Sequence, residues 1–195
     1  VGRFHVTNNL TLAVSRPLTL NGRLVKEGSG TLALGGTLKF GGSAQSDTPT
    51  AFSNVLEIAG GKLKPLTTNA CDGLAISFAE GTSLVIDGAT TDTGLLKCGL
   101  YDVKEANAPI TLASGLATLP VEVEYGDWMP TTTLWTVGLV TVKSERAAAL
   151  QGKLRLANPK PFRMRRGEIV VVDNGDGTST LAAVYKLYGL MIMVR

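Results

Sequence analysis

The 195-residue chain lacks several features on which common classes of protein depend. Its two cysteines are too few for a disulfide scaffold, and it has no run of 18 apolar residues that would form a membrane-spanning helix. The single histidine, His5, has no serine or cysteine at a recognisable triad spacing, so we expect an ordinary strand residue there. Charged residues make up only 18%, which is low for a cytosolic enzyme, and the net charge of +3 does not indicate a nucleic-acid partner.

Aromatic residues are also scarce, at 6%, so the 44% of hydrophobic residues are mainly aliphatic. Glycine is abundant by contrast, with 23 residues spaced among runs of Leu, Val and Ile. Because glycine adopts positive φ without strain, this spacing is typical of a fold with many tight corners. Threonine, serine and asparagine occupy the outward positions of the runs, as suits the outer face of a β-sheet.

A repeat between residues 24 and 66 organises the chain. TLALGGTLKF at Thr31–Phe40 is followed by a similar segment, VLEIAGGKLKPL, at Val55–Leu66. Each contains two short strands of alternating apolar and polar residues, with a Gly-Gly corner between the strands. The alignment equates Leu32 with Leu56, Leu34 with Ile58, Gly35-Gly36 with Gly60-Gly61, and Leu38 with Leu63. Leucines at positions 10, 32, 56 and 84 give steps of 22, 24 and 28 residues, a drifting period that predicts a solenoid.

The character of the sequence changes after residue 125. The later part contains a short helical segment, Ser144–Gly152, with Ser144 as its expected N-cap. It also contains the clearest hairpin of the chain, Glu168–Tyr185, with a turn at Asn174–Gly177. We therefore predict an all-β protein with a parallel β-solenoid over residues 1–125 and a C-terminal β cap region, with an antiparallel hairpin, over residues 126–195.

The segment LVKEGSGTLALGG, followed by VLEIAGGKLKPL, resembles the autotransporter-associated repeat of bacterial passenger domains. Trp135 and the final hairpin are similar to the region that closes such passengers. The resemblance covers residues 24–66 well and the rest of the chain loosely. It implies a right-handed parallel β-helix and a location on or outside a bacterial cell, and it does not bear on activity.

Acidic residues are the strongest candidates for chemistry. Glu122 and Glu124 alternate on one predicted strand and would share a face, and two carboxylates about 7 Å apart can serve inverting sugar hydrolysis. The other interpretation is a solvated outer face, because no lysine or arginine is clustered beside them in the sequence. Asp173–Gly177 has the composition of a calcium loop, but a β-turn explains each of its residues. We assign no catalytic, cofactor-binding or metal-binding residue.

Two further features allow alternative interpretations. The basic run Lys160–Arg166 is either a charged edge strand that resists edge pairing or a contact for an acidic neighbouring subunit or an anionic glycan. Trp128 and Trp135 either cover the end of the apolar core or stack on sugars.

Cys71 and Cys98 are 27 residues apart, close to the 28-residue step of the repeat. Stacked on neighbouring turns of a solenoid, their Cα atoms would lie about 4.8 Å apart, within the range that a disulfide accepts. A bridge would contribute about 3.5 kcal/mol in the chain-entropy model. The alternative is a pair of buried free thiols.

The C-terminal run Leu187–Val194 is apolar and suited to strand addition. Its residues Leu190, Met191, Ile192, Met193 and Val194 are the predicted subunit contact for head-to-tail assembly. The chain opens at Val1 without an initiator methionine, which indicates a processed chain or a fragment. The sequence thus predicts a non-enzymatic extracellular structural or adhesive subunit. The alternative is a polysaccharide-acting enzyme or a glycan-binding module on the same scaffold.

Overall fold

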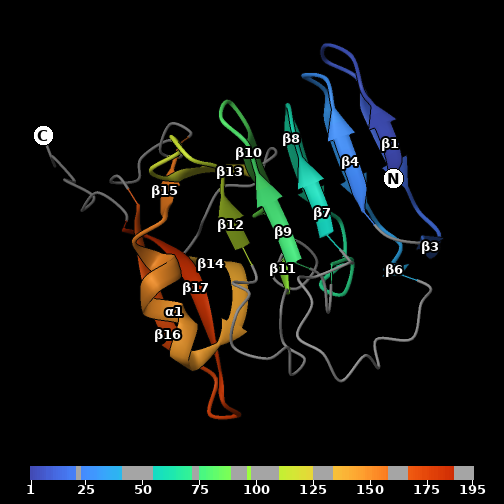
Figure 1. The fold of residues 1–195 in the computed structure, drawn as a ribbon. Helices are drawn as coiled ribbons and strands as arrows, with labels where there is room; N and C mark the ends of the chain where they lie inside the picture. The colour runs from blue at the N-terminus through green and yellow to red at the C-terminus, as the bar shows by residue number, and fades with distance from the viewer. Residues whose placement is uncertain are drawn as a thin grey trace, which may run out of the picture.

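The computed structural model of the protein describes residues 1–20, 23–40, 55–71, 75–88, 96–97, 110–124, 134–157 and 167–186. These residues form an all-β structure with a single described helix, as predicted (Figure 1). Two larger sheets are parallel throughout, and a third sheet is mainly antiparallel.

Successive strands alternate between the two parallel sheets. The first sheet contains β1 (Gly2–His5), β4 (Leu24–Glu27), β7 (Val55–Ile58), β9 (Ala75–Phe78) and β12 (Ile110–Leu112). The second contains β2 (Thr11–Val14), β5 (Thr31–Leu34), β8 (Lys62–Pro65), β10 (Ser83–Asp87), β13 (Leu119–Glu124) and β15 (Leu154–Leu156). A short parallel pair joins β3 (Leu18–Leu20) to β6 (Leu38–Phe40). Each pass of the chain therefore adds one strand to each sheet, and the strands of the first sheet lie side by side in chain order (Figure 1).

The core consists of inward side chains that stack in register from one pass to the next. In the first sheet the aligned positions are Leu24, Leu56, Ile76 and Ile110. In the second sheet they are Leu32, Leu63, Leu84 and Val121. Each of these side chains is at most 1% exposed. The stacked side chains of one column share a face of their sheet, because successive strand residues point to opposite sides.

The register predicted from the Gly-Gly corners is wrong by one strand. Leu32 pairs with Leu63, whereas Leu56 pairs with Leu24. The leucine at position 10 lies outside the strands and is 60% exposed. The step from one pass to the next ranges from 20 residues, between β2 and β5, to 37 residues, between β10 and β13, so one repeat length cannot align the strands.

The two Gly-Gly corners occupy different places in the fold, which explains the error. Gly60 and Gly61 pack on Gly28 and Gly30 of the preceding pass, and the Lys62 amide donates to the Gly30 carbonyl at 3.1 Å. Gly36 instead packs on the Arg16 backbone at a different corner. The true repeat is a first-sheet strand, a tight corner and a second-sheet strand. The corner contains glycine in the later described passes, whereas in the first pass Asn9 has the positive φ.

The third sheet lies beside the later strands of the parallel sheets (Figure 1). It contains β11 (Leu96–Lys97), β14 (Leu134–Lys143), β17 (Thr178–Lys186) and β16 (Glu168–Asp173), in that order. The predicted hairpin is confirmed by the antiparallel pair β16–β17, whose turn is closed by the Asn174 amide donating to the Thr178 carbonyl at 3.0 Å. Helix α1 (Ser144–Gln151) packs against this sheet.

Helix α1 begins differently from the prediction. Its N-cap is Lys143 and has no side-chain cap, whereas Ser144 is the first helical residue. The Ser144 hydroxyl accepts a hydrogen bond from Ser179 Oγ at 2.8 Å, so it links the helix to β17 instead of capping its own turn. The helix ends before Gly152, as predicted.

Two aromatic side chains stack on each other within the third sheet. Trp135 on β14 is 7% exposed and stacks on Tyr185 of β17, with ring centroids 5.2 Å apart. The interpretation of Trp135 as a core residue is confirmed, while Trp128 lies outside the described residues. From beyond residue 125, β15 adds to the second parallel sheet through its pairing with β13. The division of the chain at residue 125 stays a prediction.

Candidate functional site

The outer face of the second parallel sheet carries two parallel ion pairs. Lys62 Nζ lies 2.6 Å from Glu122 Oε2, and Lys64 Nζ lies 2.5 Å from Glu124 Oε2. The lysines are on β8 and the glutamates on β13, so both pairs reach across β10. The expectation that no basic residue accompanies these glutamates is wrong, because strand pairing brings together residues 60 positions apart in the chain.

The Glu122 carboxylate has more hydrogen-bond donors and is less exposed than the Glu124 carboxylate. Ser83 on β10 donates its hydroxyl to Glu122 Oε1 at 2.8 Å, while Lys62 binds the other oxygen. The Ser83 residue is 7% exposed, and the Glu122 side chain is 27% exposed against 54% for Glu124. Two fixed donors therefore orient the Glu122 carboxylate, whereas the pair formed by Glu124 is an exposed surface ion pair of small expected energy.

A cavity of about 330 Å³ opens beside Glu122. It lies at the corners between the two parallel sheets and is lined by Ser29, Gly61, Lys62, Gly81, Thr82, Ser83, Pro120 and Glu122. Thr82 is 1% exposed, and its hydroxyl donates to the Ala79 carbonyl at 2.6 Å, so this side chain of the lining has a fixed orientation. Polar side chains of three successive strands thus converge on one concave site, which we call the Glu122 cavity.

The Glu122 cavity is better suited to hydrogen bonding than to acid–base chemistry. Both carboxylates that the sequence proposed as a hydrolytic pair are bound to lysines, so neither has the apolar surroundings that create a general acid. Within the described ranges, no group of three or more His, Cys, Asp or Glu side chains has the arrangement of a metal site. The arrangement can bind a polar ligand through its ammonium, hydroxyl and carboxylate groups.

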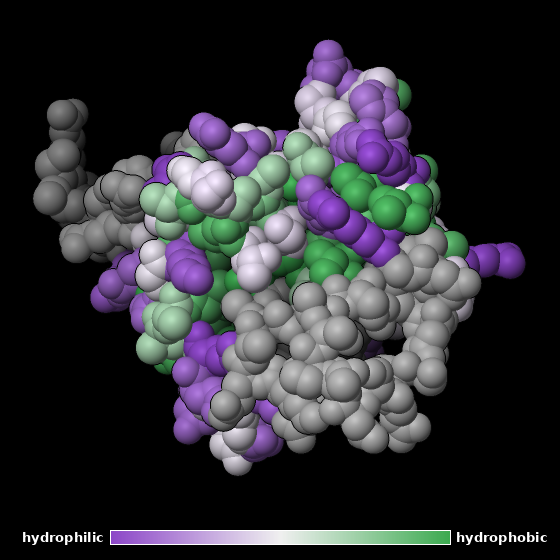
Figure 2. Space-filling model, in the orientation of Figure 1, coloured by the Kyte–Doolittle hydropathy of each residue, from purple (hydrophilic) through white to green (hydrophobic). Residues whose placement is uncertain are grey.

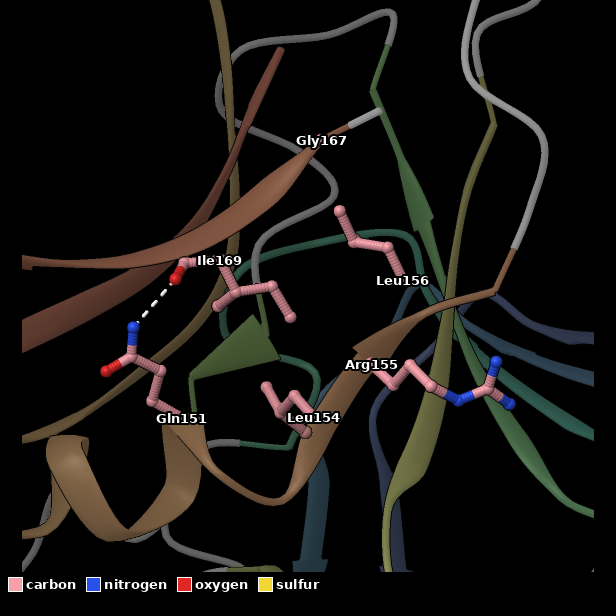
Figure 3. A pocket seen from close by; sticks show the side chains of 6 residues that line it. All are labelled: Gln151, Leu154, Arg155, Leu156, Gly167 and Ile169. Atoms are coloured by element: carbon pink, nitrogen blue, oxygen red, sulfur yellow. Dashed lines mark hydrogen bonds between the residues drawn. The ribbon is translucent and has the colours of Figure 1, made fainter. Parts of the chain in front are cut away.

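A second cavity, of about 310 Å³, lies between β15 and β16 (Figure 3). Its lining residues are Gln151, Leu154, Arg155, Leu156, Gly167 and Ile169. Gln151 Nε2 donates to the Ile169 carbonyl at 2.7 Å, and the Arg155 guanidinium points away from this pair in Figure 3. Leu154, Leu156 and Ile169 contribute apolar side chains to this open cavity, and its two long polar side chains, Gln151 and Arg155, point in different directions.

A lysine in the core was missed by the sequence analysis. Lys26 is 0% exposed and occupies the inward column between Phe4 and Ile58. Its Nζ donates to the Gly28 carbonyl at 2.5 Å and to the Gly60 carbonyl at 2.6 Å, so it links the corners of two passes. Burial lowers the pKa of Lys26, because desolvation disfavours the ammonium form. The signal in the sequence is a lysine at an inward position of an alternating strand.

The outer face of the first parallel sheet carries further ion pairs. Arg3 lies 2.5 Å from Glu27, and Arg23 pairs with Glu57. His5 is an exposed residue of β1 whose Nδ1 lies 3.8 Å from Glu27 Oε2, as expected for an ordinary strand residue. On the face drawn in Figure 2, hydrophilic and apolar residues are interspersed over the described surface.

Two other predicted features have clear outcomes in the described residues. In the loop from Asp173 to Gly177, Asp173 Oδ1 accepts from the Gly175 amide and Asp176 Oδ1 accepts from the Thr178 amide, both at 3.0 Å. The carboxylates thus stabilise their own turn, which supports the β-turn interpretation. The basic run Lys160–Arg166 and the predicted contact residues Leu190, Met191, Ile192, Met193 and Val194 lie outside the described residues.

Cys71 carries a free, fully buried thiol, and Cys98 lies outside the described residues. For Cys71 the structure therefore describes the free-thiol alternative, and the state of the pair stays a prediction. Burial raises the pKa of the Cys71 thiol to about 12, because the thiolate is disfavoured in apolar surroundings.

Cys71 is expected to resist alkylation by iodoacetamide in the folded protein at pH 8 and to react readily in urea. The reagent needs thiolate, of which a buried group with this pKa has very little. Mass spectrometry of alkylated peptides separates Cys71 from Cys98. Fast labelling of Cys71 in the folded state would contradict the burial, and unlabelled cysteines in unfolded, unreduced protein would indicate the Cys71–Cys98 bridge.

Comparison of the chain with family models, with curated proteins and with solved structures gives no match. The resemblance to the autotransporter-associated repeat therefore stays a prediction. In the described part of the chain, no helix is both long and apolar enough to cross a membrane.

Proposed function

We propose that this chain is a segment of a right-handed parallel β-helix that serves as a structural or adhesive element outside a bacterial cell, without catalysing a reaction. The observation that supports the proposal best is the in-register stacking of inward side chains, from Leu24 through Leu56 and Ile76 to Ile110. Such stacking makes an elongated element in which each pass depends on its neighbours.

The mechanism of such an element is mechanical. Strand hydrogen bonds run along the stack at roughly 4.8 Å per pass, so load on the ends is shared by two parallel sheets. The outer faces carry ion pairs that cross between strands, such as Lys62–Glu122 and Arg3–Glu27. These ion pairs link different passes of the stack through side chains as well as through the backbone.

Electron microscopy of the purified chain, with circular dichroism, tests this function. We expect elongated particles and a β spectrum with little helix. Incubation with a mixture of oligosaccharides should leave every oligosaccharide intact. Spherical particles would contradict the elongated stack, and cleavage of any component would favour the enzyme instead.

A glycan-binding module on the same scaffold is the second candidate. It is favoured by the Glu122 cavity, where a carboxylate held at both oxygens lies beside buried hydroxyl groups. A polysaccharide-acting enzyme would need a carboxylic acid free to donate a proton, whereas Glu122 and Glu124 are both paired with lysines.

We further propose that the element assembles head to tail. The strands of the first pass, β1, β2 and β3, each lie at the end of their sheet within the described residues, so one edge of each strand is open to pairing there. Leu12 on β2 is 37% exposed at this edge, although its partner Leu32 is fully buried. An added strand would gain main-chain hydrogen bonds and cover Leu12, and contact between unlike ends produces a filament.

Leu12→Lys is expected to abolish concentration-dependent association, because an ammonium at the open edge opposes the burial of a new strand. The matched control is Val172→Lys, at a similarly exposed position of β16 (44% against 37% for Leu12). Multi-angle light scattering over a concentration series of the native chain measures the effect. A monomeric wild type at high concentration, or equal loss of association in both variants, would reject the assembly.

A further inference from the structure

We propose that the Glu122 cavity is a binding site for a neutral hexose unit of an oligosaccharide. This inference deepens the adhesive function proposed above and rests on it only for the biological context. The cavity volume of about 330 Å³ lies at the small end of the range of ligand sites, roughly 300–1,000 Å³, and suits one sugar ring better than a larger ligand.

The hydrogen-bonding groups of the cavity match adjacent sugar hydroxyls. Lys62 has three N–H donors, of which one is directed at Glu122, and Glu122 retains lone pairs beyond those used by Lys62 and Ser83. Ser83 donates to Glu122 and keeps acceptor capacity at its oxygen. A vicinal diol, in which each hydroxyl both donates and accepts, can bond to the carboxylate and the ammonium at once.

The charge of the site favours a neutral ligand. Lys62 and Glu122 neutralise each other at 2.6 Å, so an acidic or a basic ligand would have to compete with an existing ion pair. A neutral hydroxyl adds hydrogen bonds without separating the two charges. The Lys62 and Glu122 side chains are already ordered by their contact. Binding therefore costs little additional side-chain entropy.

The shape of the cavity supports the same ligand. Pro120 provides an apolar surface against which the C–H face of a sugar ring can pack. Gly61 and Gly81 line the cavity at φ +68° and +74°, and no atom outside the immediate chain lies within 4 Å of the position of a β-carbon at Gly81. The corner at Gly81 is thus not covered by other parts of the described chain. Thr82 and Ser83, which are 1% and 7% exposed, are the buried hydroxyl residues of the lining.

Saturation-transfer NMR and calorimetry with the native chain test the site. The probes are neutral gluco-, manno- and galacto-oligosaccharides, an oligogalacturonate as the acidic comparison, and glycine as a zwitterion. We expect at least one neutral oligosaccharide to bind. Glu122→Gln and Lys62→Met should each weaken it at least tenfold, because each removes a charge-assisted hydrogen bond. Glu124→Gln and Lys64→Met are the matched controls and should bind as the wild type does, because their ion pair spans the same strands outside the cavity.

Ser29→Trp gives an independent test if a charge variant fails to fold. Ser29 is exposed at the mouth of the cavity, so an indole there should block binding while both ion pairs persist. The proposal is overturned if no neutral oligosaccharide binds, if the acidic oligomer or glycine binds more tightly, or if the Glu124 and Lys64 controls lose as much affinity. Elongated particles without sugar binding would reject the site alone and leave the structural function intact.

Discussion

Gly61→Ala is expected to lower the free energy of unfolding by about 3 kcal/mol or more. Gly61 has φ +68°, where an alanine is strained by roughly 1–3 kcal/mol. A β-carbon there would also overlap the Gly30 carbonyl oxygen of the preceding pass and the ammonium nitrogen of Lys26. Because the carbonyl belongs to backbone that pairs with Lys62, it cannot move without disturbing the stack, and overpacking of this kind typically adds 1–3 kcal/mol.

The matched control for Gly61→Ala is Gly81→Ala, one pass further along. Gly81 has nearly the same backbone conformation, φ +74°, but a β-carbon there would meet open space. We expect this variant to lose only the strain energy, about 1 kcal/mol. Urea unfolding followed by circular dichroism measures both values. Equal losses would mean that the close packing of successive corners does not stabilise the stack.

The fold class was predictable from local patterns. Short runs of alternating residues indicated the strands, and the Asn-Asp-Gly composition of the turn indicated the β16–β17 hairpin, because both depend on neighbours in the chain. The register was not predictable in the same way. Two Gly-Gly pairs look alike in sequence, yet Gly36 packs on Arg16 whereas Gly61 packs on Gly30, and this difference depends on loops of unequal length between the passes.

The sequence indicated only part of the candidate site, because the rest depends on the strand register. Glu122 and Glu124 stood out because they alternate on one strand. Their lysine partners on β8 and the hydroxyl of Ser83 on β10 become neighbours only through strand pairing. A correct register would have placed Lys62 beside Ser83 and would have changed the interpretation of the acidic face.

Substitutions of Lys26 should separate the contribution of core packing to stability from the contribution of the buried charge. Its aliphatic stem fills an inward position that Phe4 and Ile58 occupy in the neighbouring passes, and its ammonium satisfies the Gly28 and Gly60 carbonyls. Lys26→Ala should lower the free energy of unfolding by about 3 kcal/mol, because it leaves a cavity and removes both hydrogen bonds. Lys26→Met keeps most of the volume and should cost about 1 kcal/mol at neutral pH, since removal of a desolvated charge offsets part of the lost bonding.

The pH dependence of the Lys26→Met variant gives the decisive measurement. Burial lowers the pKa of Lys26 below its ordinary value of 10.5, so between the lowered and the ordinary value the unfolded chain binds more protons than the folded one. The free energy of unfolding of the wild type therefore gains a contribution as pH rises through that window, whereas the methionine variant has no group to titrate there. We expect the deficit of Lys26→Met relative to wild type to grow toward pH 10.5, as measured by urea unfolding at a series of pH values. A deficit that stays constant or shrinks with rising pH would show that the Lys26 ammonium is as well stabilised in the core as in water.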